Sequence, residues 1–302
     1  MNHNTTYKIS TSNALNLRAE LQRLGFKFAD AQHAFWRASN PEATLTFYHT
    51  GKLLIQGRDP GIITKFLVGI GILCPEIQSR SLRWIGTDES GKGDYFGPLV
   101  VASVLSTSPT KDKLLRLGVR DSKKIPLVDT IKQLAGHIKN LCPHSTVIIT
   151  PPKYNDAYEK MRSWGKLHRI LAWGHAKAIE NILQKETCDY AVADQFSAEK
   201  YIKNALMERG RLLTLIQRHH AEDDVAVAAA SILAKDEYTK SLATLSIKYS
   251  IDLPAGASNK VIEVGKEFVQ RYGEGELREI AKLHFVTTKY ILNPEFFNKA
   301  NP

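Results

Sequence analysis

The chain has 302 residues, of which 43% are hydrophobic, and it carries a formal net charge of +10. That length suits two domains with real cores, and the basic balance favours a polyanionic partner, most commonly nucleic acid. The three cysteines form no CxxC pair, which excludes a zinc pattern and fits reduced thiols in a cytoplasmic protein. The first residues are too polar for a signal peptide, and residues 62–73 are too few to span a membrane.

Residues 1–78 are predicted to form a small α+β domain. Leucines recur at helical spacing over residues 13–24, and short runs rich in Phe, Trp, Tyr and Thr follow. The expected elements are helices at 13–24 and 60–73 and strands at 35–37, 43–48 and 53–56. Because Lys27, Arg37 and Lys52 lie among these strands, the sheet is a candidate nucleic-acid surface. An ordinary sheet with one solvated face is the alternative.

The second domain is predicted to run from residue 82 to 302, after a polar linker at 75–81. Its strands alternate with helices, which is typical of the α/β class. The expected strands are 82–85, 99–105, 146–149, 190–193 and 212–216; the expected helices are 127–141, 164–184 and 221–233, and helices from 258 to 283 with a break at 272–275.

Residues 86–98 form the most distinctive stretch, a turn between two predicted strands. Its first seven residues fit a phosphate-binding P-loop, but Gly93 stands where that motif needs Ser or Thr. A P-loop also runs into a helix, whereas Pro98 and a β-branched run follow here. The nucleotide-binding interpretation is therefore set aside.

Acidic residues follow several of the predicted strands. Asp88 and Glu89 end one strand, Asp194 ends another, and three acids at 222–224 lie just past a third. The carboxyl ends of neighbouring strands in α/β sheets converge, so these carboxylates would repel one another without cations between them. Mg²⁺ and Mn²⁺ prefer such ligands, and a pair of these ions hydrolyses phosphodiesters. The alternative is that the acids cap turns and helices, since acids in a first helical turn suit the helix dipole.

Residues 87–99 closely resemble the signature of the type 2 ribonucleases H, and blocks at 121–124, 194–196 and 228–235 agree in order. Lys92, the Asp-Tyr-Phe that follows the turn, and the N-terminal extension resemble the HIII subtype. The resemblance implies an α/β ribonuclease H-like catalytic domain, a mixed sheet flanked by helices. It also implies that residues 1–78 form a substrate-binding domain resembling the TATA-binding-protein fold.

The resemblance also implies roles for individual residues. The metal-binding acids are Asp88, Glu89 and Asp194. The fourth catalytic acid is assigned to Glu222 for its residue type, although its spacing to Ser231 is one residue short and Asp223 and Asp224 compete. The residues expected to contact substrate are Gly91, Lys92, Gly93, Ser122, Lys123 and Lys124. A solvated basic turn is the alternative for the last three.

The expected activity is endonucleolytic hydrolysis of the RNA strand of RNA/DNA hybrids, with Mg²⁺ or Mn²⁺ activating water and leaving 5′-phosphate and 3′-hydroxyl ends. Neither a membrane nor an obligate protein partner is implied. Two alternatives stay open. One is the HII-type activity at single ribonucleotides embedded in DNA, and the other is a hybrid-binding module without catalysis.

Overall fold

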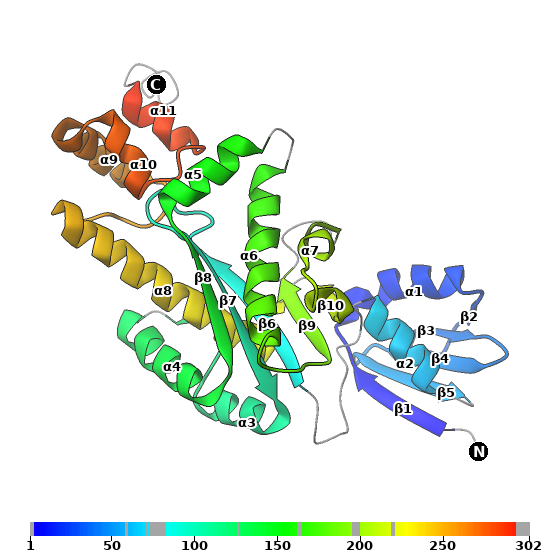
Figure 1. The fold of residues 1–302 in the computed structure, drawn as a ribbon. Helices are drawn as coiled ribbons and strands as arrows, with labels where there is room; N and C mark the ends of the chain where they lie inside the picture. Colours follow the sequence, from blue (N-terminus) through cyan, green and yellow to red (C-terminus); the bar gives the residue numbers. More distant parts are fainter. Residues whose placement is uncertain are drawn as a thin grey trace. The chain divides into compact units, whose positions relative to one another are not determined.

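The computed structural model describes residues 3–57, 60–70, 72, 83–125, 127–161, 165–194, 200–218 and 221–293. The chain divides into two compact units, Met1–Ser79 and Arg80–Pro302, which are described separately (Figure 1). The predicted linker at 75–81 lies outside the described residues. Within them, no helix is long and apolar enough to cross a membrane.

The first unit is an antiparallel sheet of five strands, in the order β1-β5-β4-β3-β2, with two helices. Its elements are β1 (His3–Lys8), α1 (Ala14–Arg23), β2 (Lys27–Ala29), β3 (Ala34–Ser39), β4 (Ala43–Tyr48), β5 (Lys52–Gly57) and α2 (Pro60–Gly69). Alternate strand residues such as Trp36 and Phe47 share one core with Leu17 of α1 and Leu67 of α2. The opposite face of the sheet carries Arg37 and other polar side chains.

The second unit is built on a mixed sheet in the order β10-β9-β6-β7-β8. Strands β10, β9 and β6 are parallel, and β7 pairs antiparallel with both β6 and β8. The strands are β6 (Arg83–Ser90), β7 (Leu99–Thr107), β8 (His144–Ile149), β9 (Tyr190–Asp194) and β10 (Thr214–Arg218). The helices are α3 (Ser108–Arg116), α4 (Val128–Leu141), α5 (Pro151–Lys160), α6 (Lys166–Leu183), α7 (Lys200–Ala205), α8 (Val225–Tyr249), α9 (Asn259–Tyr272), α10 (Leu277–Ile280) and α11 (Val286–Leu292).

Helices cover both faces of this sheet (Figure 1). Helix α8 packs on β6 and β7, α6 packs on the other face, and α4 packs against α8. The start of α8 comes so close to β6 that a Cβ at Gly86 would lie 2.1 Å from the backbone nitrogen of Val227. Only glycine fits there, and this close approach fixes α8 beside the strand that carries Asp88 and Glu89.

The C-terminal segment is joined to the turn that follows β6. Phe96 and Ala281 form an antiparallel bridge, and Gly97 N donates to Ile280 O at 2.8 Å. Lys282 is 1% exposed, and its Nζ donates to Gly97 O at 2.6 Å. The chain beyond residue 280 thereby holds the backbone of this turn in place.

Candidate active site

The sheet register brings two of the predicted strand ends together. Strands β6 and β9 are parallel neighbours with Thr87 opposite Ala193, so Asp88 and Asp194 lie at the same edge of the sheet. A pocket of about 550 Å³ opens there. It is lined by Asp88, Glu89, Ser90, Gly91, Lys92, Gly93, Asp94, Ser122, Lys123, Ile125, Val128, Ile131, Asp194, Ser231 and Lys235. Eight of the predicted site residues therefore share one pocket. The side chain of Lys124 is outside the described part.

The carboxylate of Glu89 is held from two sides. Lys92 Nζ lies 2.6 Å from Oε1, and His175 Nε2 lies 3.2 Å from Oε2. Burial alone would raise the pKa of Glu89. The hydrogen bond and charge of His175, followed by the charge of Lys92, outweigh burial and lower that pKa to about 2. Glu89 is therefore ionised at any pH near neutrality.

His175 is itself oriented by Thr87. Thr87 Oγ1 donates its one proton to Ala102 O at 2.9 Å, so it accepts from His175 Nδ1 at 2.8 Å. The other ring nitrogen, Nε2, lies 3.2 Å from Glu89 Oε2. The histidine is 1% exposed and lies in the middle of α6, so its ring is fixed by packing as well. Sequence analysis missed this residue; its only signal was a histidine within an apolar helix face.

Asp88 has a different environment from its neighbour. Burial, followed by the negative charge of Glu89, raises the pKa of Asp88 to about 7, although a hydrogen bond from Ser231 opposes the rise. Ser231 Oγ in turn lies 2.7 Å from Ser122 Oγ. The predicted basic turn thus reaches Asp88 through two hydroxyl groups. Burial and the neighbouring carboxylate thus both disfavour the ionised form of Asp88 in the absence of a cation.

The pKa of Lys92 shows that the acids of the pocket lie close together. Burial alone would lower the pKa of its ammonium group. The opposing effects of Glu89, then Asp88 and Asp194, are larger, so the pKa is raised overall. All three predicted metal-binding acids therefore act on one lysine in the pocket.

The two glycines of the turn differ in their surroundings. Gly91 has φ of +86°, and a Cβ there would lie 2.2 Å from Pro98 O, so no other residue fits. A Cβ at Gly93 would meet nothing within 4 Å. Gly93 is exposed at the pocket, which leaves its backbone open to a ligand.

The acids at 222–224 do not line this pocket. Asp224 caps α8 by accepting from Ala226 N at 2.8 Å and Val227 N at 3.2 Å, and it also accepts from Trp84 Nε1. Asp223 is exposed and Glu222 is half-buried in the turn before α8. Asp224 therefore has a structural role as a helix cap, while the fourth-acid role of Glu222 stays a prediction.

The donor set of the pocket fits a divalent cation that keeps several waters. Within the described ranges, no three His, Cys, Asp or Glu side chains lie close enough to hold one ion jointly. Mg²⁺ commonly uses only one or two carboxylates and completes its shell with water. Asp88 and Glu89 supply such a pair, and both line the pocket.

Comparison with known proteins agrees with this geometry. The sequence model of the family described as Ribonuclease HII matches residues 85–288. Ribonuclease HIII of Protochlamydia amoebophila (strain UWE25) is 41% identical over 285 residues, covering 92% of this chain and 93% of that protein. Ribonuclease HIII of Chlamydia pneumoniae is 40% identical over 287 residues, covering 92% of this chain and 95% of that protein.

Solved structures extend the similarity to both units. Bst-RNase HIII in complex with Mn²⁺ matches with a TM-score of 0.66 and 27% identity, covering 96% of this chain and 98% of that one. Aquifex aeolicus RNase H3 matches with a TM-score of 0.56 and 27% identity, covering 93% and 99%. The predicted fold class, a ribonuclease H-like domain preceded by a small sheet domain, is thus confirmed. By sequence and fold, the chain belongs to the type 2 ribonuclease H family and, within it, to the ribonuclease HIII group.

Proposed function

We propose that this chain is an endoribonuclease that hydrolyses the RNA strand of RNA/DNA hybrids with Mg²⁺ or Mn²⁺. The observation that carries the proposal is the single pocket shared by Asp88, Glu89 and Asp194, with Gly93 and Lys123 on its wall. Carboxylates can hold the ions that hydrolyse phosphodiesters, and an open glycine backbone allows close approach to a ribose 2′-hydroxyl.

In this proposal Asp88, Glu89 and Asp194 would hold the cations. Glu222, which does not line the pocket, is assigned as the fourth acid by the family resemblance. Bound cations would supply an activated water and neutralise the leaving oxygen, and the product ends would be 5′-phosphate and 3′-hydroxyl. His175 and Lys92 keep both oxygens of Glu89 in place before any substrate arrives.

The remaining pocket residues are assigned to the substrate. The open backbone at Gly93 allows close approach to a ribose, whose 2′-hydroxyl distinguishes RNA from DNA. Lys92, Lys123 and Lys235 line the pocket and are assigned to phosphate contacts. Lys124 is assigned to the same role by the family resemblance alone, because its side chain lies outside the described part. Ser122 positions Ser231 and, through it, Asp88.

The first unit is proposed to bind the same duplex through the sheet face opposite its helices. Arg37 is exposed there, and it pairs in register with Thr46, which in turn lies opposite Leu54. Exposed Lys27 and Phe35 lie on the neighbouring part of the sheet. Such a face offers cations and small polar groups to a sugar-phosphate backbone.

The test compares two labelled duplexes of equal length, one with a continuous RNA strand and one with a single ribonucleotide in DNA. The proposal predicts cleavage within the RNA run when Mg²⁺ or Mn²⁺ is present and none after chelation. Preferred cleavage at the single ribonucleotide would favour the HII-type activity instead. Binding without a metal-dependent product would favour a module that only binds hybrids.

A further inference from the structure

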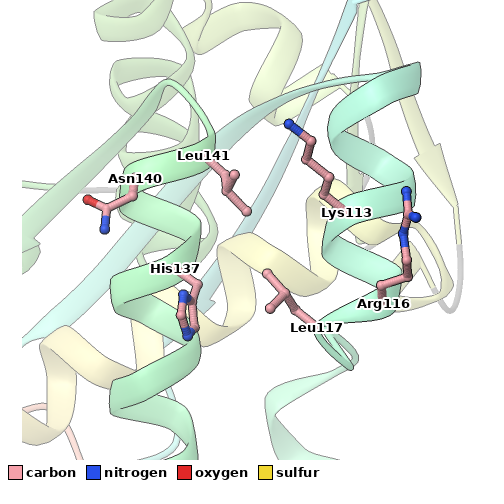
Figure 2. Close-up of a pocket in the computed structure, with 6 residues that line it drawn as sticks. All are labelled: Lys113, Arg116, Leu117, His137, Asn140 and Leu141. Carbon is pink, nitrogen blue, oxygen red and sulfur yellow. The ribbon is translucent and has the colours of Figure 1, made fainter.

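A second concave site lies between α3 and α4, which both pack against α8. The groove has a volume of about 410 Å³. Its lining residues are Lys113, Arg116, Leu117, His137, Asn140 and Leu141 (Figure 2). In Figure 2, Lys113 lies across from Leu141, and Leu117 lies across from His137. The groove therefore combines nitrogen-bearing side chains with two leucines along its length.

The polar lining favours an anion. Lys, Arg and Asn side chains are donors, His carries at least one N–H, and none of the described lining residues is acidic. No acid in the described part of the chain forms an ion pair with Lys113 or Arg116. By contrast, Lys139 on the same helix as His137 contacts Asp236 at 3.3 Å. Arg116 Nε donates to the backbone carbonyl of Asp112 at 3.2 Å, and neither Lys113 nor Arg116 has a carboxylate partner among the described residues.

The apolar part of the lining restricts the chemical class of the ligand further. Leu117, which directly follows α3, is 37% exposed, and Leu141 at the end of α4 is half-buried. A phosphodiester backbone gains little from leucine side chains, because its contacts are charged or polar. A peptide that carries both carboxylates and an apolar side chain satisfies the two halves of the groove at once.

The groove also points away from the catalytic pocket. Val128 and Ile131 of α4 line the catalytic pocket, whereas His137, Asn140 and Leu141 line the groove. With 3.6 residues per turn, these two sets face directions about 160° apart around the helix. A partner in the groove therefore does not compete for the α4 residues that line the catalytic pocket.

We propose that the α3–α4 groove docks an acidic segment of another protein. Carboxylates of that segment pair with Lys113 and Arg116, and an apolar side chain packs between Leu117 and Leu141. The site recruits the enzyme to a partner and takes no part in catalysis.

The test uses a displayed library of random 12-residue peptides selected on the full chain. Enriched peptides are expected to combine Asp or Glu with Leu, Ile or Phe. Synthetic copies should bind at least tenfold more weakly to a Lys113→Gln/Arg116→Gln variant. They should bind with little change to Lys111→Gln/Lys132→Gln, which removes the same charge from exposed positions of α3 and α4 outside the groove. Cleavage of an RNA/DNA hybrid should be the same for both variants.

Three outcomes would overturn the proposal. The first is a selection that yields no peptide dependent on Lys113 and Arg116. The second is an equal loss in the Lys111→Gln/Lys132→Gln control, which would indicate general attraction to a basic surface. The third is a tenfold loss of hybrid affinity in the groove variant alone, which would make the groove a nucleic-acid contact.

Discussion

Lys282 is predicted to make stability rise with pH above neutrality. Its ammonium group is buried and donates to Gly97 O at 2.6 Å and more weakly to Phe96 O at 3.4 Å. Burial lowers the pKa of Lys282 from 10.5 to about 7, although the charge of Asp94 opposes the shift. Between these two values the unfolded chain binds a proton that the folded chain does not.

The magnitude follows from the size of the shift. A pKa lowered by about 3.5 units costs the folded state about 5 kcal/mol below pH 7, where the lysine is charged in both states. The penalty shrinks as pH rises from 7 toward 10.5. Between pH 7 and 9, this one group should raise the free energy of unfolding by about 2 kcal/mol.

Other groups near Lys282 titrate outside this window. Burial, followed by the charge of Lys282, lowers the pKa of His284 to about 4. Burial raises the pKa of Tyr95 to about 12, and it raises the pKa of Tyr238 further above its usual range. Asp88, whose pKa burial raises to about 7, titrates in the wild type and in a Lys282 variant alike, so the difference in slope between the two proteins from pH 7 to 9 reports Lys282.

The assay is urea denaturation of the wild type and Lys282→Met at pH 7, 8 and 9. Methionine keeps the length of the side chain and removes its charge. The wild type should gain about 2 kcal/mol relative to the variant across this range. Parallel pH profiles for the two proteins would refute the reasoning, because Lys282 would then titrate alike in both states.

Three further substitutions, the first with a matched control, test the packing and the site. Gly86→Ala should lower the free energy of unfolding by more than about 2 kcal/mol, because its Cβ would collide with the start of α8. The control Gly136→Ala, whose Cβ would meet nothing within 4 Å, should be neutral or stabilising in thermal denaturation. Asp224→Asn should keep both stability and cleavage, since Asn caps helices as well as Asp does; lost cleavage in a folded variant would instead reveal a catalytic acid. His175→Phe should weaken Mn²⁺ binding about 10- to 100-fold by titration calorimetry because Glu89 loses an orienting partner, and unchanged affinity would contradict that role.

In the second domain the central strands and the longer helices were predictable from sequence, whereas α3, α5 and α7 were missed. Long apolar strands such as β7 and periodic helices such as α4 carry strong patterns, and their predicted positions agree with the structure to within a few residues. Strands β1 and β2 were missed, because β1 is polar and β2 has three residues. The helix predicted at 60–73 ends at Gly69 as α2, and the strand predicted at 212–216 begins at Thr214 after a 3₁₀ turn.

The site was predictable where its residues are close in sequence or follow strands. Asp88 and Glu89 were expected just at a strand end, and they lie inside β6, which continues to Ser90. Their nearness to Asp194 depends on the parallel pairing of β6 with β9, which the alternating pattern suggests but does not specify. His175 could not be predicted, because its contact with Glu89 joins residues 86 positions apart and depends on how α6 packs on the sheet.

Metal-dependent cleavage by the carboxylate variants tests the proposed activity most directly. Asp88→Asn and Asp194→Asn each keep the shape of the side chain and remove one negative charge from the pocket. Each purified variant, with its fold checked by circular dichroism, would be compared with the wild type on an internally labelled RNA/DNA hybrid in Mg²⁺ and in Mn²⁺. Loss of cleavage in both variants with hybrid binding retained is the predicted result. Cleavage at the wild-type rate by either variant would contradict a metal-binding role for that carboxylate.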